Sequence, residues 1–328
     1  MAHMALYPDP ALPGRPLFVV HDKAGRPLVL VVDASGRLLL LRGGAWTAIG
    51  LPAPVRRADV RQDGDGLLAI ALALADDTLL VATGLAPVLA DGWQAALVPC
   101  PGMPPQARVA RLAFGPLQQG APPLLLVSAN VGGELATWYG NGATPARGLR
   151  PLRLPDHACA VGSYRLPGAW VLRDGALRFA SFDATGREVD VTYPNLPART
   201  ESVLLAPGSM PNVPDVFAAG TAIVVYRGNN SVAQRVAEVA GARLLWSAHN
   251  RAGEYLVYAH ADATLWMVSR PAHGAWRSPV FLTSRRAVPL ALHDGTLHTA
   301  ALHEGALTLL RYDAQGIPLG EETIALPQ

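Results

Sequence analysis

Short apolar runs alternate with tight polar turns along this chain. In the first unit the runs are Leu17–Val20, Pro27–Val32, Arg37–Leu41 and Trp46–Leu51, and the turn Asp33–Gly36 separates the second run from the third. Apolar runs of this length, bounded by Asp, Ser and Gly, are typical of strands joined by hairpin turns. We therefore expect each unit to hold four strands, called inner, second, third and outer.

The same unit recurs with a period of about 42 residues. The apolar residues that open the third strands are Leu38, Leu79, Leu135, Leu177, Ile223, Leu265 and Leu307. Such a period, with several short strands in each unit, predicts an all-β fold, a seven-bladed β-propeller of four-stranded antiparallel blades. The longer second step contains a proline-rich loop, Pro99–Gln106. Tryptophan is expected to open three outer strands, at Trp46, Trp93 and Trp276.

Composition indicates one domain with a large core. Half of the 328 residues are hydrophobic and 16% are charged, a balance that argues against disorder. We assign residues 15–328 to a single propeller domain and residues 1–14 to an N-terminal segment, in which His3-Met4 resembles a cloning scar. No apolar run approaches the roughly 18 residues that cross a bilayer, so no membrane insertion is expected. No secretory signal is visible, and the compartment stays open.

Basic residues stand at equivalent places just before the inner strands. They are Arg15, Arg57, Arg108, His157, Arg199, Arg243 and Arg286. In a propeller the inner strands line a central channel, so these side chains are expected to ring one of its mouths. Guanidinium groups match carboxylate, sulfate or phosphate groups, which predicts an anionic small molecule or an acidic glycan as ligand. Alternatively, each arginine pairs with a carboxylate of the neighbouring blade.

Histidines stand at the other end of the inner strands. His21, His249 and His293 belong to the first, sixth and seventh units, which become neighbours if the ring closes. Three histidines with an open position are a familiar zinc arrangement, so these residues are the candidate metal ligands. His260 and His303 lie in turns on the arginine side. They are the candidates for proton transfer in a lyase, hydrolase or cyclase that uses the same channel.

Two stretches resemble known propeller families. Gly36 to Thr47 and Thr264 to Pro279 resemble the Gly, Leu and Trp pattern of tectonin-like bacterial propeller lectins. That resemblance implies carbohydrate binding, with Trp46, Trp266 and Trp276 as sugar platforms; otherwise these tryptophans pack blade against blade. Asp63-Gly64-Asp65-Gly66, preceded by Ala58-Asp59-Val60, is similar to the calcium loops of integrin-type propeller repeats. It lacks the later acidic ligand of that pattern, and a plain polar turn is the other interpretation.

These patterns favour a binding module over other classes of protein. The sequence has no Gly-x-Ser-x-Gly elbow, phosphate-binding glycine loop, dinucleotide fingerprint or His-Glu-x-x-His motif. The net charge is only +2 and the arginines are not interleaved with aromatic residues, so no nucleic-acid partner is expected. No cofactor is expected, with zinc and calcium as the two ions that the patterns allow. A protein partner on the proline-rich loop is a third alternative, and the sequence does not decide whether a reaction is catalysed.

Overall fold

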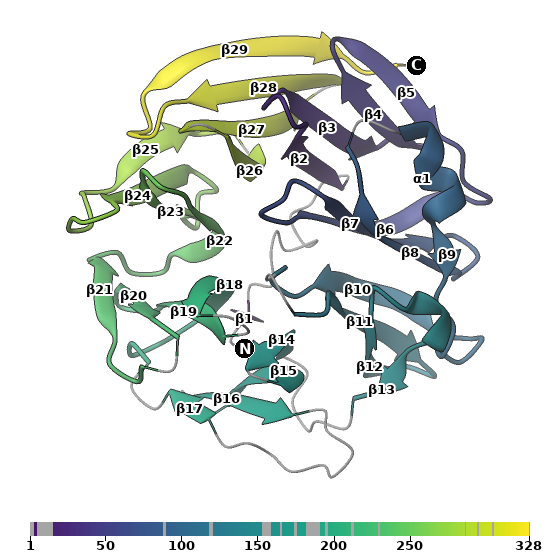
Figure 1. Ribbon diagram of the computed structural model, residues 1–328, viewed down its shortest axis with the longest axis horizontal. Helices are drawn as coiled ribbons and strands as arrows, with labels where there is room; N and C mark the ends of the chain where they lie inside the picture. Colours follow the sequence, from purple (N-terminus) through teal and green to yellow (C-terminus); the bar gives the residue numbers. More distant parts are fainter. Residues whose placement is uncertain are drawn as a thin grey trace.

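The apolar runs form β-strands, and the sheets built from them follow one another around a central axis (Figure 1). The computed structural model describes residues 3–4, 16–87, 90–117, 121–152, 159–164, 166–173, 176–181, 191–193, 196–210, 213–228, 230–285, 287–293, 295–303 and 305–327. Hydrogen bonding groups the strands of these residues into seven antiparallel sheets, six with four strands and one with a fifth. This arrangement confirms the predicted all-β propeller class.

The first three sheets occupy the N-terminal part of the ring. Their strands, in order, are β2 (Leu17–His21), β3 (Pro27–Val32), β4 (Leu38–Arg42) and β5 (Ala45–Ile49); β6 (Val55–Gln62), β7 (Leu68–Leu74), β8 (Leu79–Leu85) and β9 (Val98–Pro99); and β10 (Arg108–Phe114), β11 (Leu124–Val131), β12 (Glu134–Asn141) and β13 (Arg150–Pro151). Two short helices accompany them, α1 (Ala90–Ala96) and the 3-10 helix η1 (Pro145–Arg147).

Four further sheets complete the ring. Their strands are β14 (Cys159–Tyr164), β15 (Leu166–Arg173), β16 (Ala176–Ser181) and β17 (Val191–Tyr193); β18 (Ser202–Met210), β19 (Val213–Ala219), β20 (Ile223–Tyr226) and β21 (Gln234–Ala237); β22 (Arg243–His249), β23 (Gly253–Ala259), β24 (Leu265–Pro271) and β25 (Val280–Thr283); and β26 (Ala287–His293), β27 (Thr296–His303), β28 (Ala306–Tyr312) and β29 (Pro318–Ala325). The extra strand β1 (His3–Met4) pairs in parallel with the inner strand β18.

Several of the hairpins share one type of turn. Asp22, Asp33, Asp63 and Asp313 each stand at the end of a strand, and each accepts two backbone N–H bonds on Oδ1, from the residues two and four positions later. A glycine at the fourth position closes each turn with a positive φ, between 76° and 84°. Such φ values favour glycine, because a Cβ atom clashes with the backbone there. The short Asp-x-x-Gly sequences therefore determine where these strands stop.

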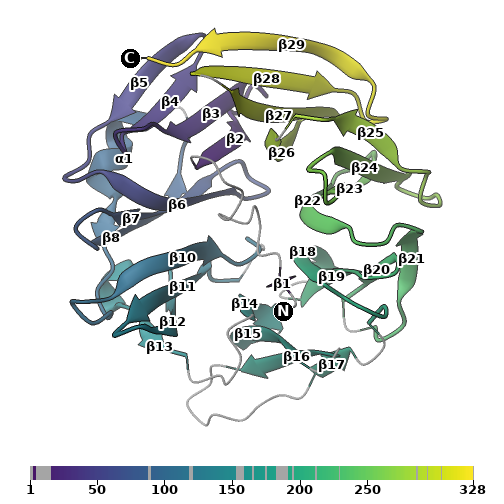
Figure 2. The same cartoon turned by 180° about the vertical axis from the view of Figure 1, so that it is seen from behind.

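The middle strands are buried on both faces because each sheet packs against a sheet on either side. All seven residues of β7 are buried, and so are the first four of β4. This explains why their sequences are continuous apolar runs instead of alternating ones. The strand β29, at the outer edge, has no fully buried residue. Figure 2 shows the same ring from behind, with β29 and β5 on the outside.

Packing of side chains closes the ring between its first and last sheets. Among the described residues, all four strands of the first sheet, β2–β5, come from the N-terminal part of the chain. All four strands of the last sheet, β26–β29, come from the C-terminal part. A buried cluster joins them, with Val19, Val31 and Leu39 on one side and Ala300 and Leu307 on the other. We call this contact the closing seam. Apolar burial is a main source of its stability, because none of the described strands is exchanged across it.

The insertion after β8 differs from the prediction. Trp93 does not open an outer strand but lies in α1, where it is 1% exposed and its indole N–H donates to the carbonyl of Ala86 at 3.0 Å. The inserted chain buries this large ring by forming a helical turn over the sheet, and the outer strand β9 follows it. Neither this helix nor any other described one is long and apolar enough to cross a membrane.

Candidate functional site

A cavity of about 840 Å³ lies at the C-terminal ends of the inner strands. Its polar lining comes from three sheets. It includes His21 on β2, Arg61 and Gln62 on β6, the carboxylates of Asp63 and Asp65 in the turn after β6, and His249 and Asn250 at the end of β22. Apolar side chains such as Val20, Val60 and Trp246 complete the wall. A concave site of this size, mostly apolar with a few placed polar groups, has the usual properties of a small-molecule site.

Gln62 fixes the wall between the first two sheets. Its amide oxygen accepts the backbone N–H of His21 at 3.0 Å, and its amide nitrogen donates to the carbonyl oxygens of His21 at 2.6 Å and Gly66 at 3.0 Å. These bonds join β2 to β6 across a boundary that no strand pairing covers. The amide of Gln62 thereby holds His21 in register at the cavity.

A histidine cluster lies next to the cavity, on the closing seam. His21 Nε2 lies 2.9 Å from His298 Nδ1, and the rings of His21 and His293 are 5.5 Å apart between centroids. Two of the three predicted metal ligands, His21 and His293, are therefore neighbours. The third ring beside them is His298 of β27, whereas His249 is exposed at the end of β22. Within the described parts of the chain, no three His, Cys, Asp or Glu side chains are arranged to hold a metal ion.

Burial keeps the two bonded histidines neutral. It lowers the pKa of His21 to about 3, assisted by the nearby His298 and His293, against the opposite effect of Asp22. It also lowers the pKa of His298 to about 4, with Arg311 and His293 adding to the effect. A neutral imidazole donates from one nitrogen and accepts at the other, so the bond between His21 Nε2 and His298 Nδ1 needs one ring to donate and the other to accept.

A buried ion pair forms another part of the wall. Asp59 and Arg61 lie two residues apart on β6, and Arg61 Nε is 3.2 Å from Asp59 Oδ2. The same carboxylate oxygen accepts the backbone N–H of Phe114, on the inner strand of the next sheet, at 2.6 Å. Both side chains are almost fully buried, at 7% and 5% exposure for Arg61 and Asp59. Sequence reasoning missed this pair, although the spacing of Asp59 and Arg61, two residues apart on a strand, puts both side chains on one face.

The predicted arginine ring lies at the opposite end of the inner strands. Arg57, Arg108 and Arg199 are exposed and Arg243 is half-buried. Arg57 donates to the backbone carbonyls of Ala110 at 3.3 Å and Arg56 at 3.1 Å. None of the four described members lines the cavity. Arg15, His157 and Arg286 lie outside the described residues.

The three candidate sugar platforms are half-buried between sheets. The Trp46 indole N–H donates to the carbonyl of Ala325 at 2.9 Å, across the closing seam. Trp266 is in edge contact with His260 and Phe281, at centroid distances of 5.6 and 5.5 Å. Trp276 is in edge contact with Phe217 at 6.3 Å, and the Arg270 guanidinium lies 5.4 Å from its ring centroid. Each tryptophan thus contributes to packing between or within sheets.

The catalytic candidates occupy separate places. His260 lies between Tyr258 and Trp266, at centroid distances of 5.4 and 5.6 Å. His303 is exposed at the end of β27. The predicted calcium loop begins with Asp63, whose Oδ1 accepts the N–H groups of Asp65 at 2.9 Å and Leu67 at 2.8 Å. Its conformation is the Asp-x-x-Gly turn found at three other hairpins, where the third residue is Ala24, Ser35 or Gln315.

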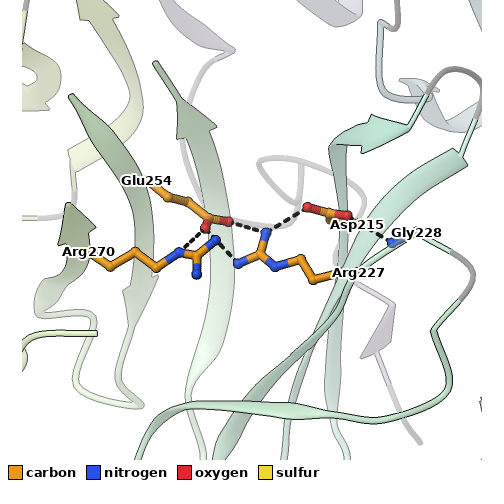
Figure 3. Close-up of polar contacts among 5 residues, drawn as sticks. All are labelled: Asp215, Arg227, Gly228, Glu254 and Arg270. Carbon is orange, nitrogen blue, oxygen red and sulfur yellow. Dashed lines mark hydrogen bonds and ion pairs between the residues drawn. The ribbon is translucent and has the colours of Figure 1, made fainter. Parts of the chain in front are cut away.

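A second ion network joins the fifth and sixth sheets (Figure 3). Arg227 donates to Asp215 at 2.6 Å and makes two bonds of 2.6 Å to Glu254. Arg270 donates to Glu254 at 2.7 Å, and Gly228 N–H donates to the other oxygen of Asp215 at 3.1 Å. Glu254 is also the cross-strand partner of His249, so the network supports the wall that carries this cavity residue.

Comparison with known proteins identifies the fold. No family model matches the sequence, and no curated protein matches it significantly. The BP39L lectin from Burkholderia pseudomallei is similar in structure, with a TM-score of 0.59 and 18% identity over 95% of this chain and 99% of the lectin.

Two enzyme structures are also similar, over a smaller part of their length. A prolyl endopeptidase has a TM-score of 0.54 at 11% identity, and the match covers 96% of this chain and 50% of that protein. A puromycin hydrolase has a TM-score of 0.53 at 14% identity, and the match covers 100% of this chain and 57% of the hydrolase. The chain thus spans about half the length of these enzymes. At such low identity these likenesses show a shared β-propeller fold.

Proposed function

We propose that this protein is a ligand-binding propeller, with its seven sheets as seven blades, that takes a sugar or another small polar molecule into the central cavity. The observation that carries the proposal is the cavity of about 840 Å³ with His21, Gln62 and His249 in its wall. Its size suits a mono- or disaccharide with ordered water, and its wall offers both donors and acceptors. The structural likeness to a lectin supports a carbohydrate as the ligand class.

An anionic ligand is the finer part of this proposal. Arg61 is the one arginine or lysine in the described lining of the cavity, which also contains Asp63 and Asp65, so the support for an anion comes from the arginine mouth. Arg57, Arg108 and Arg243 stand at the other end of the inner strands, where their field adds along the axis. We infer that an acidic glycan or a small carboxylate is preferred over its neutral counterpart, because a guanidinium group matches a carboxylate with two parallel hydrogen bonds.

A glycan array that contains neutral and acidic sugars tests the proposal, followed by titration calorimetry with each hit. We expect His249→Ala, an exposed cavity residue, to weaken binding about tenfold, a loss of about 1.4 kcal/mol. Substitution of Arg57 and Arg243 by alanine tests the predicted arginine mouth. A loss of affinity restricted to acidic hits supports that mouth, and an unchanged affinity for every acidic hit shows that the arginine mouth does not bind the anion.

The enzyme alternative predicts a different outcome of the same experiment. If His260 or His303 moves a proton during a reaction, mass spectrometry after incubation will find the bound probe converted to product. Recovery of the intact probe supports a binding module. Absence of binding by every sugar and carboxylate, together with an unaltered fold, would overturn the proposed function.

A further inference from the structure

The outermost strand of the last sheet differs in length from its counterparts. β29 has eight residues, whereas the described outer strands of the other six sheets have between two and five. It ends the strand order of its sheet, so only β28 pairs with it among the described strands. Figure 1 shows β29 along the outside of the ring. Its outer edge therefore presents a long row of backbone N–H and C=O groups to solvent.

A long open edge of this kind is suited to accept a further strand. Edge strands of natural proteins are usually short, covered or blocked, because their free backbone groups pair readily with another extended chain. No residue of β29 is fully buried, and Ile317 and Leu319 at its start are each 54% exposed. When an extended segment of a partner adds to such an edge, backbone bonds give affinity and the alternating side chains give specificity.

The side chains of β29 place a negative charge on each face of the strand. Glu321 is the cross-strand partner of Leu310, which packs between the sixth and seventh sheets, and Glu322 is the partner of Leu309, which packs in the closing seam. Arg285 lies 3.2 Å from Glu321, and both side chains are exposed. None of the described arginine or lysine residues pairs with Glu322. The strand itself contains no basic residue.

These charges argue against a second copy of this chain as the added strand. If two β29 strands pair over their full length around a two-fold axis, Glu321 and Glu322 of one copy face the same two residues of the other. Like charges opposite each other destabilise a strand pair, whereas opposite charges stabilise it. The complement of this edge is an extended segment with basic residues at two successive positions.

We propose that the outer edge of β29 binds an extended, basic segment of a partner protein by strand addition. Basic residues of that segment lie opposite Glu321 and Glu322, and an apolar residue lies opposite Leu319. None of the residues of β29 lines the cavity, so this surface is separate from the proposed ligand site. The inference therefore does not depend on the proposed function.

An eight-residue peptide, Thr-Val-Thr-Lys-Lys-Thr-Val-Thr, is the probe. Its sequence reads the same in both directions, so the two lysines meet the two glutamates in either orientation of the added strand. The charge control is Thr-Val-Thr-Glu-Glu-Thr-Val-Thr. The backbone control is Thr-Pro-Thr-Lys-Lys-Thr-Pro-Thr, which keeps both charges but lacks one N–H donor on each edge of the peptide.

Fluorescence anisotropy measures the affinity of each labelled peptide, and hydrogen–deuterium exchange locates the binding. We expect the lysine peptide to bind at least tenfold more tightly than either control. It should slow exchange of the amides of β29 and leave exchange in the short outer strand β5 unchanged. Equal binding of the proline peptide would show attraction between charges without strand addition, and would overturn the inference.

A charge-neutral variant tests the role of the glutamates. The double variant Glu321→Gln/Glu322→Gln should lose about tenfold in affinity for the lysine peptide and bind the glutamate peptide more tightly. Glu134→Gln/Glu238→Gln is the matched control, because it removes two exposed carboxylates from other sheets, and it should behave like the unmodified protein. Equal effects of the two double variants would contradict a specific edge.

Sedimentation velocity of the unmodified protein examines the other occupant. A dimer whose β29 amides exchange faster on dilution would show that a second copy covers this edge, and would overturn the inference. Absence of protection of β29 by the lysine peptide would overturn it as well. None of these outcomes bears on sugar binding in the cavity, so the failure of this inference and the failure of the proposed function are separate results.

Discussion

Two buried ion networks in this ring differ in how completely their charges are satisfied. Arg227 contacts Asp215 and both oxygens of Glu254 at 2.6 Å, and Arg270 adds a further bond to Glu254 (Figure 3). The distance between Arg61 Nε and Asp59 Oδ2 is 3.2 Å. The first network joins two sheets outside the cavity lining, whereas Arg61 belongs to the cavity wall.

This difference indicates which of the two charges is better stabilised in the folded protein. For Arg227, burial favours the neutral form, but the hydrogen bonds to Glu254 and Asp215 outweigh it and raise the pKa of the guanidinium group. For Asp59 burial prevails and raises the pKa of the carboxyl group. A charge that is held by several short bonds is costly to lose. The Arg227 network accordingly stabilises the contact between its two sheets, and the Asp59 carboxylate is the less stabilised of the two charges.

Removal of the central arginine should give the largest effect. Arg227→Met leaves Asp215 and Glu254 buried without their main counter-charge, and we expect the free energy of unfolding to fall by about 3–5 kcal/mol. Urea denaturation measures this change. Arg235→Gln is the control, because Arg235 pairs with Glu238 on the exposed surface and should shift stability by no more than about 0.5 kcal/mol. Equal effects of the two substitutions would contradict a structural role of the network.

A lower pH should also reduce the free energy of unfolding, because two histidines are buried at the closing seam. The folded protein holds the pKa of His21 at about 3 and that of His298 at about 4, whereas in the unfolded chain both are near 6.5. The unfolded state therefore binds more protons below pH 6.5, so stability is constant above that value and falls as the pH is lowered toward 4. Between pH 7 and pH 5 we expect a loss of about 2 kcal/mol per histidine.

Urea denaturation at several pH values checks this expectation. His298→Phe removes one titrating group and should roughly halve the slope of stability against pH. The variant His249→Phe changes an exposed histidine at the cavity and should keep the full slope. A wild-type protein with equal stability at pH 7 and pH 5 would show that the two histidines are not buried at the seam.

A pair of isosteric substitutions gives the finest comparison of the two networks. Glu254→Gln removes a charge that receives bonds from two arginines and should lower the free energy of unfolding by about 2–3 kcal/mol. Asp59→Asn removes a charge whose neutral form is already favoured by burial, and should change stability by less than about 1 kcal/mol. Thermal unfolding of both variants measures the difference. A larger loss for Asp59→Asn would show that the Asp59 charge is the more strongly stabilised of the two.

Local sequence patterns predicted most of the fold. The turn at Asp33–Gly36 was identified from its residues, and the Oδ1 of Asp33 does bind the N–H groups of Ser35 and Arg37. Trp93 is expected to open an outer strand like Trp46 and Trp276, but it lies in the helix α1, and Trp276 precedes β25, which begins at Val280. The strand pattern carries no information on how inserted residues fold back onto a sheet.

The candidate site was predicted less well. The prediction that His21 and His293 become neighbours is confirmed, since both lie at ends of inner strands in the first and last sheets. His298 was missed, because it lies inside the second strand of its sheet and reaches His21 only across the closing seam. The arginine mouth stays a prediction. The Asp59 carboxyl group accepts the backbone N–H of Phe114, a residue of the next sheet. No pattern in the sequence of β6 reveals this hydrogen bond.

The sequence by itself determined the strands, the hairpin turns and the repeated four-strand unit, because apolar runs and Asp-x-x-Gly turns act over a few neighbouring residues. Only the tertiary structure decided which side chains meet around the axis. His21 and His298 are 277 positions apart, and their contact depends on how the first and last sheets are staggered when the ring closes. That stagger is set by packing over the whole closing seam, so the histidine pair, the Asp59 pair and the cavity between the sheets follow from the assembled ring.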